Sequence, residues 1–214
     1  MRTLHPTLAA RFLGLLAAIV LSLAPATPTR ATTVIAPDFD GLVSKADYVV
    51  RAVVKSVTCE YRTTPRGKAI FTKVELQVLE TITGTPPSPL VLDVLGGTVD
   101  GATLHVEGVP EFHVGDEDIL FVQNIGRQFF PLVGIMNGKF PIKRDASTGS
   151  AYVARSNGVA VYDTQDLKQG MGSPAVAQAQ HVGQAPLTPE AFAGKIRAAA
   201  QNKALPPKPP SLAN

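Results

Sequence analysis

One stretch of strict alternation constrains the fold more than any other feature of the sequence. Every second residue from 70 to 78 is Ile, Thr, Val, Leu or Val, while positions 73, 75 and 77 between them are Lys, Glu and Gln. Side chains of a β-strand point alternately to its two faces, so this pattern predicts a strand with one buried and one hydrated face. β-Forming residues also fill 48–59, and the polar segment 63–68 separates the two runs. This arrangement predicts an antiparallel hairpin with a loop of moderate length.

A second constraint is the segment 104–122, which predicts strand, bend, turn and strand. Gly108 and Pro110 interrupt its first part, and a Gly-Asp pair at 115–116 marks a tight turn. The four consecutive apolar residues of 119–122 are typical of a strand that is buried on both faces. Further strands are expected over 90–95, 103–106, 128–134, 138–143, 151–155 and 159–162, the last two joined by an Asn157-Gly158 turn.

Short strands dominate the pattern, and only two short helices accompany them, one of them over 38–46 with Asp38 as its expected cap. The 18 glycines and 18 prolines supply many turns. We therefore expect an all-β fold, a small OB-like antiparallel β-barrel with a short N-terminal helix, an extra C-terminal hairpin and a C-terminal helix. A β-sandwich is the alternative. The expected organisation is a signal peptide (1–31), a β-barrel domain (32–163), a flexible linker (164–187), a short helix (188–203) and a Pro-rich disordered tail (204–214).

The beginning of the chain has the pattern of an export signal. Arg2 and Arg11 precede an uncharged apolar run over 12–24. A membrane-spanning helix needs about 20 apolar residues, so this shorter run fits a secretory signal peptide better than an anchor. Small residues allow cleavage after Ala26 or Ala31. We expect an exported protein, periplasmic or secreted, with no stable membrane anchor after cleavage; a retained N-terminal anchor is the alternative.

Charge and cysteine content exclude some functions. Residues 1–31 hold three of the 20 basic residues and none of the 17 acidic ones, so the remainder carries 17 of each. The absence of net charge after residue 31, the absence of tryptophan and an aromatic content of 6% argue against nucleic-acid binding, which uses basic, aromatic-studded surfaces. The single cysteine, Cys59, rules out an internal disulfide. We interpret it as a small, partly buried apolar residue, with intermolecular pairing as the alternative.

Two groups of residues carry a family resemblance. Residues 45–54, with the sequence KADYVVRAVV, resemble the opening strand of netrin-like domains, the OB-type barrels of tissue inhibitors of metalloproteinases. The pattern formed by 96–97, 108–116 and 120–121 is similar to a group of exported bacterial proteins of unknown function that often accompany matrixin-like zinc peptidases. The resemblance covers roughly 33–145. It implies a netrin-like barrel and a secreted peptidase as partner, but not the inhibitors' mechanism, because their N-terminal cysteine and disulfides have no counterpart here.

The candidate chemistry centres on histidines. Two of them, His105 and His113, lie near Glu107, and two histidines with a carboxylate can ligate zinc. Their spacing matches no compact metal motif, so we expect them to be surface or half-buried polar residues. The acidic run 116–118 lacks the pattern of a calcium loop and predicts a solvated turn. Ser173 lies in the expected linker, without the strand-turn-helix context of a nucleophile.

These patterns assign no catalytic, cofactor-binding or metal-binding residue and imply no cofactor. The leading hypothesis is a non-catalytic exported β-barrel domain that binds a protein partner outside the cytoplasm, such as a secreted peptidase. One alternative is a metal-dependent hydrolase that uses His105, Glu107 and His113. Another is an envelope-glycan or small-ligand binder that uses the barrel mouth. No nucleic-acid partner is expected.

Overall fold

The structure is a computed structural model that describes residues 36–123, 130–170 and 172–204. The chain separates into two units, 1–34 and 35–214, and every described residue belongs to the second. The expected signal peptide and nearly all of the expected Pro-rich tail lie outside the described residues. Among the helices that are described, none is both long and apolar enough to cross a membrane.

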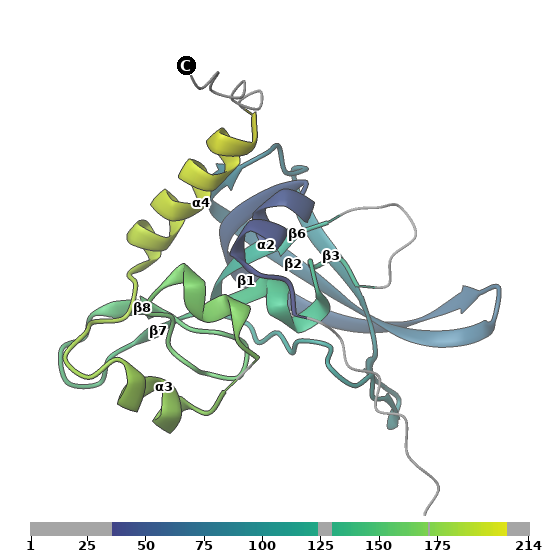
Figure 1. Ribbon diagram of the computed structural model, residues 1–214. Coiled ribbons are helices and arrows are strands. Elements are labelled where there is room, and N and C mark those ends of the chain that lie inside the picture. Colours follow the sequence, from purple (N-terminus) through teal and green to yellow (C-terminus); the bar gives the residue numbers. More distant parts are fainter. Residues whose placement is uncertain (1–35, 124–129, 171, 205–214) are drawn as a thin grey trace, which may run out of the picture. The chain divides into compact units, whose positions relative to one another are not determined.

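Antiparallel strands form the framework of the described unit (Figure 1). Its main sheet has six strands in the order β3-β2-β1-β6-β7-β8, and a separate hairpin pairs β4 with β5. The strands are β1 (Tyr48–Thr64), β2 (Gly67–Thr83), β3 (Leu90–Leu95), β4 (Gly97–Val99), β5 (Ala102–Leu104), β6 (Glu117–Val122), β7 (Lys139–Arg144) and β8 (Ala151–Val153). This confirms the expected antiparallel β-rich fold. Within the described ranges the sheet ends at β3 and β8, with no pairing between these two strands.

The long β1–β2 hairpin differs from expectation at its tip. The two strands stay paired as far as Thr64 and Gly67, so the turn consists of two residues instead of the polar loop expected over 63–68. The Thr64 hydroxyl accepts a hydrogen bond from Arg66 N (3.2 Å) and donates one to Gly67 O (2.8 Å). An exposed antiparallel ladder accepts polar residues, which is why polarity alone misplaced the strand ends.

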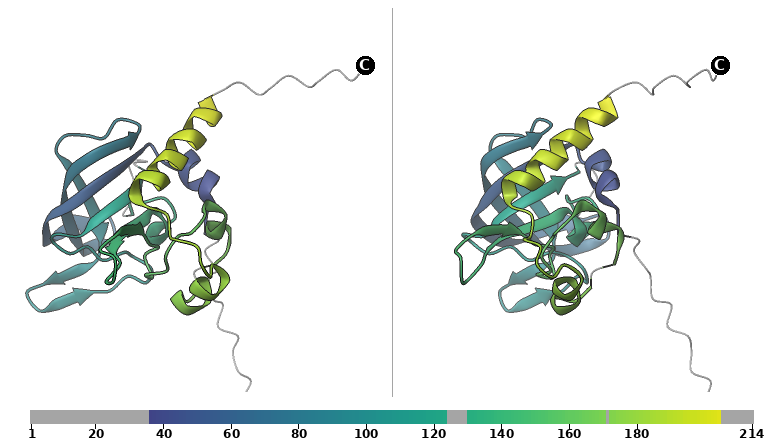
Figure 2. Two further views of the ribbon diagram at one scale, coloured as in Figure 1. Left: turned by 90° about the vertical axis from the view of Figure 1, so that its left-hand side faces the viewer. Right: turned by 60° about the vertical axis from the view of Figure 1, so that its left-hand side comes forward.

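Strand β6 is buried on both faces, as its apolar run predicted. Ile119 and Phe121 belong to one core, while Leu120 and Val122 belong to another. The first core is covered by α2 (Phe39–Lys45) and α4 (Pro189–Ala204), which Figure 2 shows side by side. The second core lies on the opposite face of β6 and is built mainly from β1, β2 and β3. The sheet is therefore the middle layer between two apolar clusters.

Both expected helices are present. The N-terminal one is α2, and Asp38 caps it by accepting a hydrogen bond from Gly41 N at 2.8 Å. The C-terminal one is α4, which begins at Pro189, directly after Thr188, whose hydroxyl accepts a hydrogen bond from Ala191 N at 3.2 Å. Its Phe192 ring lies 5.1 Å from the Phe140 ring, measured between centroids, in the first core. Phe192, Ala193 and Ile196 are the buried residues of this helix, and their burial holds α4 against the sheet.

The expected linker, 164–187, contains a 3-10 helix, η2 (Thr164–Lys168), and the helix α3 (Pro174–Gln180). Local capping explains both: Asp163 and Asp166 form a capping box at η2, and the Ser173 hydroxyl accepts a hydrogen bond from Val176 N.

The segments before this region also differ from expectation. In the expected terminal hairpin, β8 pairs with β7, and a single bridge joins Ala154 to Ala160. In the strand expected over 128–134, only the Leu132 bridge to Val122 is described, and the 3-10 helix η1 (Ile135–Gly138) follows it.

Candidate functional site

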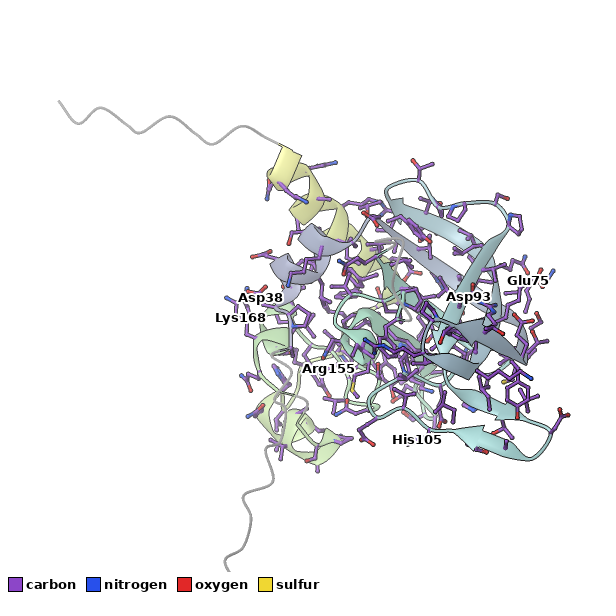
Figure 3. All side chains as sticks on the ribbon, turned by 90° about the vertical axis from the view of Figure 1, so that its right-hand side faces the viewer. Asp38, Glu75, Asp93, His105, Arg155 and Lys168 are labelled. Atoms are coloured by element: carbon purple, nitrogen blue, oxygen red, sulfur yellow. The ribbon has the colours of Figure 1, made fainter. Side chains whose placement is uncertain are left out.

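A cleft of about 290 Å³ opens beside the β4–β5 hairpin. The distal parts of β1 and β2 and the end of β3 form one side, and the segment 105–113 forms another. His105 lies at this edge of the unit, next to the hairpin (Figure 3). The apolar floor of the cleft consists of Val57, Val94, Leu95, Leu104, Val106, Val109 and Phe112. Its polar rim includes Thr98, Thr103, His105, Glu111 and His113.

Gly97 allows β4 to approach the main sheet closely at this cleft. Its φ is +127°, and a Cβ placed there would lie 2.5 Å from Thr72 Oγ1 and 2.7 Å from Cys59 Sγ. No other residue type fits this combination of positive φ and close contact without a shift of the neighbours. The glycine therefore fixes the distance between the β4–β5 hairpin and the β1–β2 hairpin.

Cys59 lies in the cleft lining as a hydrogen-bonded thiol. The Thr72 hydroxyl donates to Gly96 O at 2.7 Å, which uses its one hydrogen. Thr72 Oγ1, 3.4 Å from Cys59 Sγ, is then left to accept from the thiol. Cys59 is half-buried, as the sequence indicated.

The two predicted histidines reach the same cleft but form separate pairs. His105 Nε2 lies 3.5 Å from Glu107 Oε2, and His113 Nδ1 lies 3.4 Å from Asp116 Oδ2. The side chains of His105 and His113 are 78% and 72% exposed, so water screens both pairs. Within the described ranges, no three His, Cys, Asp or Glu side chains gather closely enough to hold a metal ion. The geometry therefore lends no support to a zinc site at His105, Glu107 and His113.

Asp118 corrects the expectation of a solvated acidic turn. It is 0% exposed, because β6 begins at Glu117 and directs Asp118 to the same face as Leu120 and Val122. Neither carboxylate oxygen of Asp118 has a hydrogen-bond partner among the described residues. Its counter-charge is Lys139 Nζ, 3.5 Å away, on a side chain that is 7% exposed. Burial raises the pKa of Asp118 to about 6, against the opposing effect of Lys139.

Lys139 connects this buried carboxylate to the cleft. Its Nζ donates to Glu111 O at 2.6 Å and lies 4.6 Å from the centroid of the Phe112 ring. Both Glu111 and Phe112 belong to the segment 109–113, which lines the cleft and which we call the cleft wall. A charge-assisted hydrogen bond and a cation–π contact from Lys139 thus hold the cleft wall in place.

A second buried cation, Arg155, lies in another part of the unit. Its Nη1 donates to the carbonyl oxygens of Gln169 (3.1 Å) and Gly170 (3.3 Å). Burial lowers the pKa of this guanidinium. Nearby, His181 stacks on Tyr162, with ring centroids 4.5 Å apart. These contacts fasten 163–170 and 172–184 to the unit and give the cluster a structural role.

Sequence reasoning missed Gly97, Asp118 and Lys139 as residues of the site. A signal existed for Asp118, because it alternates with Leu120 and Val122 in a strand that is apolar on both faces. For Lys139 the signal is absent, since its position beside the wall depends on β6–β7 pairing. No protein-family model matches the chain, and none of the curated proteins matches its sequence.

Proposed function

We propose that this protein is a non-catalytic recognition domain whose cleft binds a segment of a partner protein. The observation that carries the proposal is an open cleft with an apolar floor and a polar rim. Apolar surface supplies binding free energy, while rim groups orient the bound segment. An apolar side chain of the partner is expected to enter between Leu104 and Phe112.

The surface around the cleft supports a protein as the occupant. Val114, next to the cleft wall, is 66% exposed, so apolar surface continues beyond the cleft. Tyr61, on the β1–β2 hairpin, is also exposed, and its hydroxyl donates to Val99 O at 3.5 Å. A contact area that extends over two hairpins suits a polypeptide better than a compact small molecule.

The finer fold and the setting are part of the same proposal. The central strand β1 pairs with β2 on one side and β6 on the other, an order that is compatible with an OB-like, netrin-like barrel. The apolar run before residue 25 supports export through a signal peptide. Together with the resemblance of 33–145, this makes a secreted peptidase the partner class that we propose.

An affinity experiment with two matched variants tests the proposal. Thr103 is exposed on the cleft rim, so Thr103→Arg places a long cation across the opening without touching the core. Thr63 is also exposed but lies near the tip of the β1–β2 hairpin, outside the cleft lining, so Thr63→Arg is the control. Each purified protein is immobilised and exposed to the exported proteins of the source cells.

We expect wild type and Thr63→Arg to retain the same polypeptide, and Thr103→Arg to lose at least nine-tenths of it. Retention of no polypeptide by wild type contradicts the proposal. Equal retention by Thr103→Arg also contradicts it, because the bound protein would then lie elsewhere.

A further inference from the structure

The cleft wall rests on one buried ion pair. Asp118 on β6 and Lys139 on β7 point to the same face of the sheet, at neighbouring positions of the ladder. Lys139 in turn holds the Glu111 carbonyl and the Phe112 ring, as described above. The contacts therefore form a continuous path from a carboxylate that is inaccessible to solvent to the lining of the cleft.

We infer that the Asp118–Lys139 pair sets the shape of the cleft and that proton uptake by Asp118 loosens the cleft wall and weakens partner binding. This inference rests on the proposed function for its last step. The loosening of the wall itself concerns only this chain.

The charged groups around Asp118 are few. Lys139 and Lys143, both on β7, favour its ionised form, and Asp116 in the preceding turn opposes it. From β1, the residue opposite Asp118 is Ala52, which carries no charge. Arg51 lies on the other face of β1, where it pairs with Glu117 (2.6 Å) and Glu190 (2.9 Å). Among the described residues, Lys139 also pairs with Asp116, whose Oδ2 is 3.9 Å from Lys139 Nζ; this carboxylate is half-exposed and more distant, so it replaces Asp118 only in part.

Protonation changes the position of Lys139. A proton from solvent binds Asp118 as pH falls through about 6 and removes the buried negative charge. The Lys139 ammonium is then a buried cation with weakened compensation, a state that favours movement of its side chain towards water. Glu111 O loses its donor, and the Phe112 ring loses its cation. The wall is held less firmly as a result.

Amide hydrogen exchange of the unliganded protein tests this inference without any partner. The amides of Val109 and His113 bracket the wall, and each is hydrogen-bonded, to Val106 O (3.3 Å) and to Asp116 Oδ2 (3.2 Å). Their protection factors are measured at pH 7.5 and pH 5.0, after correction for intrinsic exchange rates. We expect protection to fall at least tenfold at pH 5.0, while amides of the β1–β2 ladder keep theirs.

Two variants separate this pair from other titrating groups. Asp118→Asn imitates the protonated carboxyl and is expected to show, at pH 7.5, the low wall protection of wild type at pH 5.0. Lys139→Met keeps the apolar stem but lacks the donor, and its wall is expected to be loose at both pH values. Glu80→Gln, which removes a surface pair with Arg197, is the matched control and should behave as wild type.

Unchanged wall protection in wild type between the two pH values overturns the inference, whatever happens to the variants. So does tight protection in Asp118→Asn. Failure of the proposed function is distinguishable, because it appears as equal partner retention by Thr103→Arg while the exchange result stands.

Discussion

At the scale of single residues, Gly97 shows how one position shapes the cleft. Two separate features require glycine at this position. The backbone has a positive φ, and Thr72 and Cys59 leave no space for a Cβ atom. Gly101 in the same hairpin also has a positive φ (+79°), but a Cβ placed there meets nothing within 4 Å. The two glycines therefore separate backbone strain from steric contact.

Replacement of these glycines by alanine gives a direct comparison. We expect Gly97→Ala to lower the free energy of unfolding by roughly 2–4 kcal/mol, because strain and overlap add. Gly101→Ala is expected to lose about 1 kcal/mol from strain alone. Denaturant unfolding measures both. Equal losses would mean that the close approach of Thr72 and Cys59 to position 97 does not affect the free energy of unfolding.

The same scale shows the limits of sequence reasoning. The half-buried position of Cys59 could be anticipated, because a strand-like run surrounds it. The burial of Asp118 was missed although it alternates with Leu120 and Val122, because polarity at a strand end is the usual sign of solvent. The contact of Lys139 with Glu111 joins residues 28 positions apart, a distance that no local pattern encodes.

At the scale of elements, α4 closes the first core. Its Phe192 ring contacts the rings of Phe39 on α2, Phe121 on β6 and Phe140 on β7, with centroid distances of 5.9, 6.3 and 5.1 Å. One helix thus joins a second helix to two central strands. The helix is held mainly by this burial, because its exposed face offers only polar and small residues.

Truncation of this ring should uncouple the helix from the sheet. Phe192→Ala is expected to lower the free energy of unfolding by about 3–5 kcal/mol, the usual result of a large cavity in an aromatic core. Val176→Ala on α3, where the valine is half-exposed, should change it by less than about 0.5 kcal/mol. Thermal or urea unfolding checks both. A small loss for Phe192→Ala would show that α4 contributes little to the core.

Elements were predictable where a local period or cap defines them. The alternation over 70–78 and the cap at Asp38 located β2 and α2. The helices η2 and α3 were missed because the composition around them is typical of a linker, although Asp163 and Ser173 offer local caps. Whether the sheet closes into a barrel could not be predicted from the sequence either, because closure depends on pairing between strands that are far apart in the chain.

At the scale of the whole molecule, ionised Asp118 lowers the free energy of unfolding, while its pair with Lys139 holds the cleft wall in place. A carboxyl whose pKa is raised in the folded state binds more protons folded than unfolded, so its contribution favours folding at low pH and is lost as pH rises. For Asp118 the window runs from its ordinary 3.8 to about 6. At neutral pH, ionised Asp118 therefore costs at most roughly 3 kcal/mol.

A neutral isostere lacks this pH dependence. We expect the stability of Asp118→Asn relative to wild type to rise by roughly 1–3 kcal/mol between pH 4 and pH 8, because only wild type loses the contribution of a protonated Asp118; loss of the charge that compensates Lys139 shifts the difference equally at every pH. Asp163 and Glu190, whose pKa values are lowered by backbone hydrogen bonds, act with the opposite sign, but they are common to both proteins and cancel. Urea unfolding across this range measures the difference. A difference between the two proteins that stays constant from pH 4 to pH 8 would contradict the account.

The central claim, that the cleft is where a partner protein binds, is tested most directly by site-specific photo-crosslinking in the source cells. A photoreactive phenylalanine replaces Thr103 on the cleft rim in one protein and Thr63 near the β1–β2 tip in another. We predict that the probe at 103 attaches one discrete polypeptide and that the probe at 63 attaches none. Attachment at neither position, or of the same polypeptide at both, would contradict the assignment of the cleft as the binding site.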